Sequence, residues 1–234
     1  MFNMSYRPVP FASGEFFHIY NRGTDKRQIF FDSADYHRFL ELLYLCNSEK
    51  PINVRDVKKT YESVYSYEHE VPLVHIGAYC LMPNHFHLLM TANIDGGISK
   101  FVKKVSTGYS MYFNKRYDRT GSLFQGAFKA EHANTDEYLK YLYAYIHLNP
   151  VKLIDPKWKE EGSKDAVKSF DFAASFQYSS LPDYLGRLRP EKAILNPTPF
   201  PGYFLSPSDI KNEMFEWLTF TQPEVSPRAG LGIL

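Results

Sequence analysis

The sequence predicts an α+β fold, in which helices pack on an antiparallel β-sheet. Residues 73–91 hold two β-rich apolar runs separated by Pro83–Asn84, which is the pattern of a hairpin and therefore of antiparallel strands. Helical patterns alternate with the strand patterns in the order β-α-β-β-α-β-α. Hydrophobic residues make up 44% of the 234-residue chain and charged residues 23%, as is typical of a globular protein.

The first strand and the first helix are indicated by composition and by capping residues. Phe16–Asn21 has the aromatic and β-branched composition of a strand. Ser33 or Asp35 is suited to cap a helix that runs to Leu45, because a short polar side chain accepts hydrogen bonds from the free N–H groups of a first turn. The polar residues 48–70 are expected to form a connecting excursion that is partly helical.

The next elements are a hairpin, a long helix and a further strand. The hairpin strands are expected at 73–81 and 85–91. A glycine pair precedes a helix expected from Ile98 to about Tyr117. Residues 123–132 alternate enough to predict another strand.

The last helix of the pattern leads to a change in the character of the chain. Asn134 or Thr135 is suited to cap this helix, which is expected to stop near Asn149–Pro150 because proline ends a helix. We therefore expect a domain at 1–154. In 155–234, proline and glycine recur and helical periodicity is scarce apart from a short segment near Met214–Phe220. We expect this part to be an irregular extension packed on or near the domain.

Composition argues for a reducing, aqueous compartment. No run of about 18 apolar residues is present, so no transmembrane helix is predicted and no membrane partner is expected. The N-terminal segment lacks a basic start followed by an apolar core, so no secretory signal is predicted. The only two cysteines, Cys46 and Cys80, lie on apolar stretches and suit buried thiols. We therefore expect a cytoplasmic protein.

Two histidines stand two residues apart at the start of the second hairpin strand. His85 and His87 should project to one face because side chains alternate along a strand, while Phe86 points to the other face. Neutral imidazole is a common metal ligand. The pair alone is compatible with a metal site or with two ordinary histidines, since zinc sites usually need a third or fourth His, Cys or carboxylate. Cys80 is expected to pack as a small apolar group.

A phenol and an amide are expected at the end of the last helix. Tyr145 and Asn149 are four residues apart, so they share a helical face. One interpretation is a tyrosine-rich core helix that ends at Asn149–Pro150. In the functional interpretation Tyr145 is a nucleophile, and Asn149 gives a neutral oxygen ligand to a metal held by His85 and His87. A phenol with a pKa of about 10 needs such a metal or a cation nearby.

The basic side chains gather in one part of a chain whose net charge is only +1. Between Ser99 and Lys129, seven Lys and Arg side chains stand against one acid, Asp118. A run of this kind is compatible with a solvated helix face, and it is also the positive stripe that a phosphate backbone requires.

Several longer blocks resemble a known family. AYCLMPNHFHLL, FNKRYDRTGSLFQGAFK and DEYLKYLYAYIHLNPVK resemble the signature blocks of the single-tyrosine, His-hydrophobic-His (HUH) transposases, and within them most closely the REP-associated tyrosine transposases. FHIYNRGTDKRQIFFDSADYHRFLELL is similar to the N-terminal block of that family. Together the blocks span roughly residues 14–153, and 177–186 resembles the trailing segment. The excursion at 48–70 and the residues beyond 187 have no counterpart in this pattern.

The resemblance implies a ferredoxin-like HUH nuclease domain and a specific activity. Such enzymes cut single-stranded DNA, usually next to a hairpin, through a 5′-phosphotyrosine intermediate that leaves a free 3′-OH. It implies that Tyr145 is the nucleophile and that His85, His87 and Asn149 hold Mg²⁺ or Mn²⁺. Candidates for contacts with the DNA are Arg22, Lys103, Lys104, Lys115, Arg116, Arg119 and Lys129. A homodimer and a monomer both stay open.

Alternatives remain at the level of the residues. Tyr138 is the reserve nucleophile because it lies nearly two turns before Tyr145 on a similar face. A domesticated DNA-binding protein would keep the fold and lack the chemistry. A third hypothesis is a metal-dependent hydrolase that uses His85 and His87 on small phosphoesters.

Overall fold

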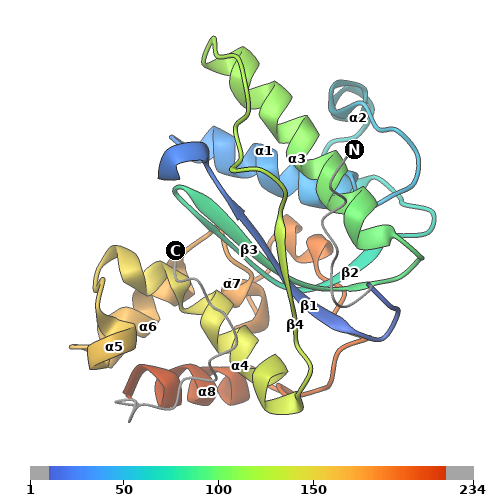
Figure 1. Ribbon diagram of the computed structural model, residues 1–234. Helices are drawn as coiled ribbons and strands as arrows, with labels where there is room; N and C mark the ends of the chain where they lie inside the picture. Colours follow the sequence, from blue (N-terminus) through green and yellow to red (C-terminus); the bar gives the residue numbers. More distant parts are fainter. Residues whose placement is uncertain (1–10, 220–234) are drawn as a thin grey trace, which may run out of the picture.

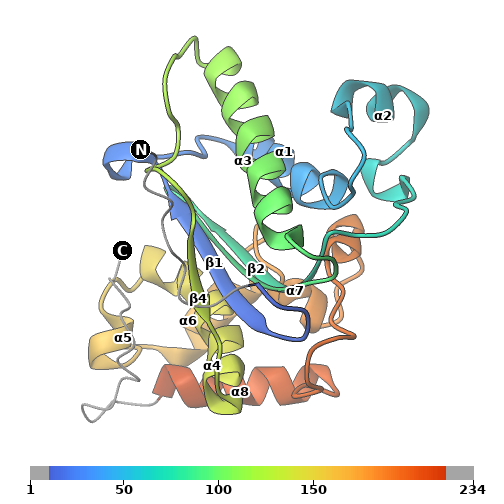
Figure 2. The same cartoon turned by 45° about the vertical axis from the view of Figure 1, so that its right-hand side comes forward.

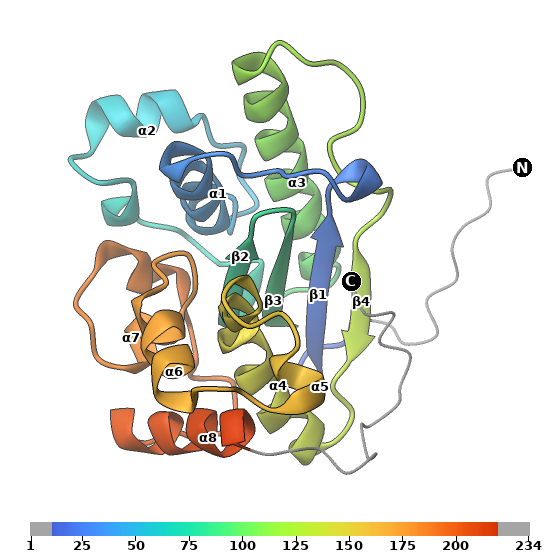
Figure 3. The ribbon, with the colours of Figure 1, turned by 90° about the vertical axis from the view of Figure 1, so that its left-hand side faces the viewer.

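The sheet of the protein is four-stranded and antiparallel throughout. The computed structural model describes residues 11–219, so predictions that concern 1–10 and 220–234 lie outside the described residues. Figure 3 shows the four strands side by side, in the order β2-β3-β1-β4. Their bounds are Phe16–Arg22 for β1, Val74–Met82 for β2, His85–Ala92 for β3 and Lys129–His132 for β4. The predicted α+β class and the predicted order of the first seven elements are confirmed.

The register decides which side chains share a face of the sheet. In neighbouring strands Cys80 pairs with His87, His87 with Tyr20, and Tyr20 with Lys129. Paired residues point to the same side and side chains alternate along each strand, so these four lie on one face together with His85. We call this side the histidine face.

Helices cover both faces of the sheet (Figure 1). The helices α1 (Ser33–Leu45) and α3 (Gly97–Arg116) pack on the face opposite the histidines, where Phe39 and Phe101 join strand residues such as Phe86 in the main core. The helix α4 (Asp136–His147) packs on the histidine face and contributes Leu142 and Ile146 to a second core. The excursion between α1 and β2 contains α2 (Val54–Thr60) and a 3-10 turn.

The residues after α4 are more helical than the sequence predicts. They form α5 (Trp158–Glu161), α6 (Ala166–Ser175), α7 (Leu181–Tyr184) and α8 (Pro207–Thr219). Figure 2 shows α8 beside α4, and apolar side chains of this segment pack with Ala144 and Leu148 in a third buried cluster. The expectation of an irregular extension was wrong because these short helices depend on packing against α4, which local periodicity does not report.

Two other boundaries differ from the prediction. The cap of α1 is Asp32, whose carboxylate accepts hydrogen bonds from the N–H groups of Ala34 and Asp35. The expected strand at 123–132 pairs continuously only from Lys129, and before that it makes a single isolated bridge between Phe124 and Gly23. Gly121 and Gly126 take positive φ values of 84° and 68° and bend the chain there. At α4 the cap is Thr135, one of the two residues expected.

Among residues 11–219, no helix combines the length and the apolar character needed to cross a membrane.

Candidate active site

The histidine pair opens β3 directly after the turn at Pro83–Asn84. Both side chains lie on the histidine face, with their ring centroids 4.9 Å apart and their planes at 87° to each other. Phe86 points to the opposite face and is 1% exposed. The turn and the strand alternation therefore present two imidazoles side by side, while the residue between them anchors the strand in the main core.

Burial keeps both imidazoles neutral. It lowers the pKa of His85 to about 3 and lowers the pKa of His87 well below its usual value. Nearby positive groups add to the effect at His85: Lys152, Lys159 and Arg22. A neutral imidazole has a free lone pair, which is the form that binds a metal ion.

The two nitrogens of the His87 ring have different surroundings. Nδ1 lies 2.8 Å from Nε2 of the buried His18. The other nitrogen of His18 lies 3.9 Å from a carboxylate oxygen of Glu131, and Glu131 accepts hydrogen bonds from the hydroxyls of Tyr20 and Tyr138. If His18 turns its N–H toward Glu131, it accepts a hydrogen bond from Nδ1–H of His87. That arrangement leaves Nε2 of His87 as the nitrogen with the free lone pair.

Nε2 of His87 is the atom that indicates a ligand-binding site. It is buried and has no hydrogen-bond partner within the described part of the chain. Buried polar atoms are nearly always paired, so an unpaired one at a functional site requires an explanation. A bound cation would satisfy this nitrogen.

Tyr145 lies beside the histidines. Its ring makes edge contacts with the rings of His87 and His18, at centroid distances of 5.4 Å and 5.5 Å. Burial raises the pKa of Tyr145 above its ordinary value. The phenol is therefore protonated at neutral pH and needs a nearby positive charge to react as a nucleophile.

The other tyrosines of α4 have different neighbours. The hydroxyl of Tyr138 donates to Glu131, with a distance of 3.1 Å. The Tyr141 ring packs against Trp217, with centroids 4.8 Å apart. Tyr143 is 2% exposed and packs among aromatic residues of the C-terminal segment, including Phe204. Tyr145 is thus the α4 tyrosine whose ring contacts His87. The reserve candidate Tyr138 is instead hydrogen-bonded to the carboxylate of Glu131.

Asn149 lies just past the end of α4. The α4 helix ends at His147, and Asn149 opens a 3-10 turn (Asn149–Leu153). The amide of Asn149 is buried, and its Nδ2 donates to the backbone carbonyl of Tyr145 at 2.8 Å. With the nitrogen held in this way, the oxygen is the end of the amide available to a ligand.

This donor set fits a divalent cation with open positions. Two neutral imidazoles and one amide oxygen leave room for water and phosphate oxygens, as Mg²⁺ and Mn²⁺ sites at phosphates do. The described residues contain no group of three or more His, Cys, Asp and Glu side chains placed to hold a metal. The described residues therefore do not indicate a zinc site made of these side chains alone. For a cation held by His85 and His87, the amide oxygen of Asn149 and oxygens of the substrate would complete the coordination.

Lys159 lies at the site but was not among the residues predicted from the sequence. This residue of α5 places its Nζ 3.6 Å from the centroid of the Tyr145 ring. The nitrogen is buried and has no hydrogen-bond partner among the described residues. Burial lowers the pKa of Lys159 well below its ordinary value, and the charge of Lys152 adds to the effect. No local pattern marks this lysine, because only the packing of α5 brings it to Tyr145.

The predicted DNA contacts fall on different parts of the surface. Arg22 and Lys129 lie on the histidine face, and Arg22 pairs with His85 in the sheet register. Lys103 lies on α3 and lines a hollow between that helix and residues 121–128. Lys115 is exposed at the end of α3. The structure therefore brings two of the seven candidates to the face that carries the histidines and Tyr145.

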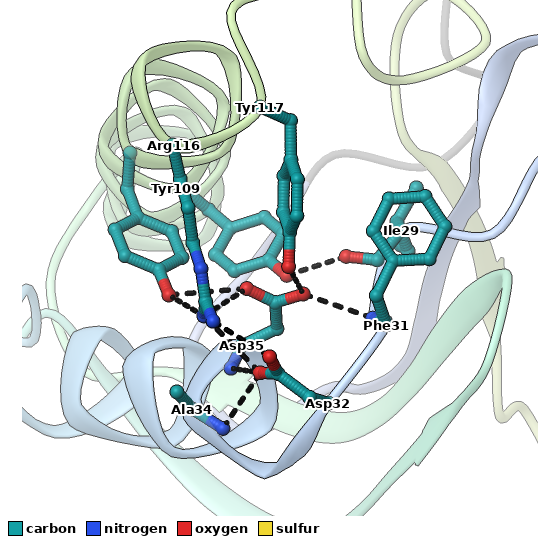
Figure 4. A network of polar contacts seen from close by, with 9 residues as sticks. Ile29, Phe31, Asp32, Ala34, Asp35, Tyr109, Arg116 and Tyr117 are labelled. Atoms are coloured by element: carbon teal, nitrogen blue, oxygen red, sulfur yellow. Dashed lines mark hydrogen bonds and ion pairs between the residues drawn. The ribbon is translucent and has the colours of Figure 1, made fainter.

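Four of the predicted DNA contacts are engaged within the protein. Nε of Arg22 donates to the side-chain oxygen of Gln125. Arg116 pairs with Asp32 and Asp35 in a network that joins the ends of α1 and α3 (Figure 4). Nζ of Lys104 donates to backbone carbonyls of the excursion, among them that of Lys50 at 2.8 Å. Arg119 donates to the side-chain oxygen of Asn114 at 3.0 Å. These contacts explain part of the basic run as structural.

Comparisons with known proteins identify the family. The family model described as "Transposase IS200 like" matches residues 32–149, which is half of the chain. The chain belongs to the IS200-like transposase family. The matched segment includes the histidine pair, Tyr145 and Asn149 at its end, and it confirms the resemblance found in the sequence.

A solved structure is also similar to this family member. It is described as "Structure of the REP associates tyrosine transposase bound to a REP hairpin", with 14% identity and a TM-score of 0.47 over 80% of this chain and 89% of that chain. No curated protein matches the chain.

Proposed function

We propose that this protein is a metal-dependent single-stranded DNA endonuclease and strand transferase, a transposase that acts at hairpin-associated sites. The observation that carries the proposal is the contact between Tyr145 and His87, whose Nε2 is buried without a partner. A tyrosine nucleophile beside a histidine nitrogen that is free to bind a metal ion is suited to attack a phosphodiester bond. Membership of a transposase family makes DNA the expected substrate.

The chemistry assigned to Tyr145 is a displacement at phosphorus. Its hydroxyl oxygen attacks the scissile phosphorus, the new Tyr–O–P bond forms, and the bond from phosphorus to the 3′ oxygen breaks. The phenol gives up its proton and the departing 3′ oxygen takes one, so the products are a 5′-phosphotyrosine link and a free 3′-OH. Attack by a second 3′-OH reverses the step and rejoins a strand without ATP.

The remaining residues bind and orient. His85, His87 and Asn149 are the proposed ligands of Mg²⁺ or Mn²⁺, which when bound supplies Lewis-acid stabilisation of charge on the phosphate. His18 and Glu131 hold the His87 ring in the orientation described above. His87 and His18 contact the Tyr145 ring within one chain, so we propose that the tyrosine acts in cis.

Covalent trapping tests the proposal. The full chain is incubated with a library of hairpin-bearing single strands and Mn²⁺ or Mg²⁺, and the adduct is read as a band that survives denaturing electrophoresis. We expect an adduct with the wild type and with Tyr138→Phe, and none with Tyr145→Phe, His85→Ala or His87→Ala. Adduct formation by Tyr145→Phe contradicts the assignment of the nucleophile. Binding of the library without any adduct supports the alternative, a domesticated DNA-binding protein.

A further inference from the structure

Lys159 is a buried lysine that faces the candidate nucleophile. Its Nζ lies over the face of the Tyr145 ring, at 3.6 Å from the centroid. Lys159 lies ten residues beyond the family match at 32–149, in the segment that packs against α4. The site as folded therefore includes a cation from the C-terminal segment.

The side-chain nitrogen of Lys159 forms no ion pair in the described residues. Its nitrogen is buried with no hydrogen-bond acceptor. After burial, the like charge of Lys152 lowers the pKa of Lys159 further, while the carboxylate of Glu160 acts in the opposite direction. Lys159 in turn lowers the pKa of His85 and His87. A buried ammonium costs free energy unless an anion or acceptors compensate it, and the aromatic face of Tyr145 compensates only part of that cost.

Lys157 offers a direct contrast on the same short segment. Its Nζ pairs with Glu161 at 3.0 Å, and its side chain is 71% exposed. The difference arises from Trp158, which is 6% exposed and anchors α5 in the third buried cluster. Anchoring at Trp158 sends the following side chain toward Tyr145 and leaves the preceding one in solvent.

An anion fits this arrangement at one place. A phosphate delivered to the hydroxyl end of Tyr145 comes within reach of the ammonium that covers the same ring. Phosphate oxygens then supply the acceptors that the described residues do not supply to this buried nitrogen. Charge-assisted hydrogen bonds of this kind are among the strongest available to a lysine.

We propose that Lys159 is a catalytic residue that binds a non-bridging oxygen of the scissile phosphate as Tyr145 attacks. This inference rests on the proposed function, and it adds a residue from outside the family's matched segment to the reaction. The approaching phosphate favours the protonated form of Lys159, because an anion close to an amine stabilises its charged form. In that form Lys159 contributes positive charge and transfers no proton, while the bonds at phosphorus change as described above. The C-terminal segment thereby completes the active site.

Matched variants of the full chain test the role of Lys159. Lys159→Met removes the amine and keeps an unbranched side chain that is one atom shorter. Lys159→Arg keeps a positive charge, and Lys157→Met is the control two residues away. We expect Lys159→Met to slow adduct formation at saturating DNA about 100-fold. Removal of one hydrogen-bond donor that stabilises negative charge in a transition state has an effect of this size. Lys159→Arg should recover most of that loss, and Lys157→Met should stay within about twofold of wild type.

Two further readouts separate catalysis from folding. The melting temperature of Lys159→Met should equal or exceed that of wild type, since a buried nitrogen without a hydrogen-bond partner is replaced by an apolar group. A neutral methylphosphonate at the scissile position should slow the wild type at least about tenfold more than it slows Lys159→Met, because the two changes remove the same interaction. Equal slowing of both proteins by methylphosphonate, or a wild-type adduct rate in Lys159→Met, overturns the proposal.

A binding measurement makes the inference independent of activity. In EDTA, inorganic phosphate should raise the melting temperature of wild type and Lys157→Met but not that of Lys159→Met. A full phosphate-induced shift in Lys159→Met overturns the proposal even if no protein forms an adduct. If wild type forms no adduct and only Lys159→Met loses the shift, the anion contact stands and the proposed function fails.

Discussion

His18 is predicted to control metal binding without touching the metal. Its Nε2 lies 2.8 Å from Nδ1 of His87, and both side chains are buried. Replacing His18 by Leu keeps a similar volume but leaves that nitrogen of His87 with no partner. The His87 ring then loses the contact that fixes both its orientation and the position of its proton.

The magnitude follows from one buried hydrogen bond. Leaving a buried polar atom unpaired costs about 1–3 kcal/mol. Loss of an outer partner of a metal-binding histidine weakens metal affinity by about 10–100-fold, or about 1.4–2.7 kcal/mol. The two estimates agree, so we expect His18→Leu to raise the Kd for Mn²⁺ by between one and two orders of magnitude.

Titration calorimetry with Mn²⁺ on the full chain measures this effect. The control is His132→Leu, since His132 stacks on Phe17 on the opposite face of the sheet and should leave the Kd unchanged. His87→Ala should abolish Mn²⁺ binding and serves as the negative control. The reasoning is refuted if His18→Leu binds Mn²⁺ as wild type does while His87→Ala does not bind.

Three other predictions follow from the same structure. A mixture of Tyr145→Phe and His87→Ala should form no DNA adduct, because each variant lacks one part of a site built in cis; recovered activity would indicate exchange of helices between chains. Urea unfolding should show that Arg116→Met lowers the free energy of unfolding, since the buried carboxylate of Asp35 loses its cation, and that it does so more than Lys115→Met; equal effects would contradict this. Burial lowers the pKa of His69, so the unfolded chain binds that proton more readily and stability falls as the pH drops below about 6.5, by at most about 1.4 kcal/mol per unit. Thermal melts between pH 7 and pH 5 should show a smaller loss in His69→Phe than in wild type, and parallel losses would exclude this role.

Sequence patterns predicted the parts of the fold that local chemistry determines. The hairpin could be predicted because Pro83–Asn84 interrupts two apolar runs, and the facing imidazoles because Phe86 must alternate with them. Thr135 was predicted as one of two caps of α4. At α1, three short polar residues that could cap the helix occur within four positions, Asp32, Ser33 and Asp35, and the choice among them depends on which side chain meets the N–H groups of the first turn.

Tertiary packing determines the rest of the site. His18 joins His87 only through the pairing of β1 with β3, and Lys159 reaches Tyr145 only because Trp158 fixes α5. The basic run at 99–129 differs, because the sequence predicted DNA contacts there and some of these side chains instead hold the protein together. Arg116 holds the carboxylates of α1 rather than facing the histidines (Figure 4).

The central claim is that Tyr145 becomes covalently attached to DNA. The most direct measurement is mass spectrometry of the peptide that retains a nucleotide after proteolysis of the trapped complex. The account predicts a single modified peptide that contains Tyr145, with the 5′-phosphate on its phenolic oxygen and a free 3′-OH on the released strand. A 5′-phosphate found on Tyr138 or on another residue, or a cleaved strand with no linked peptide, would contradict the account.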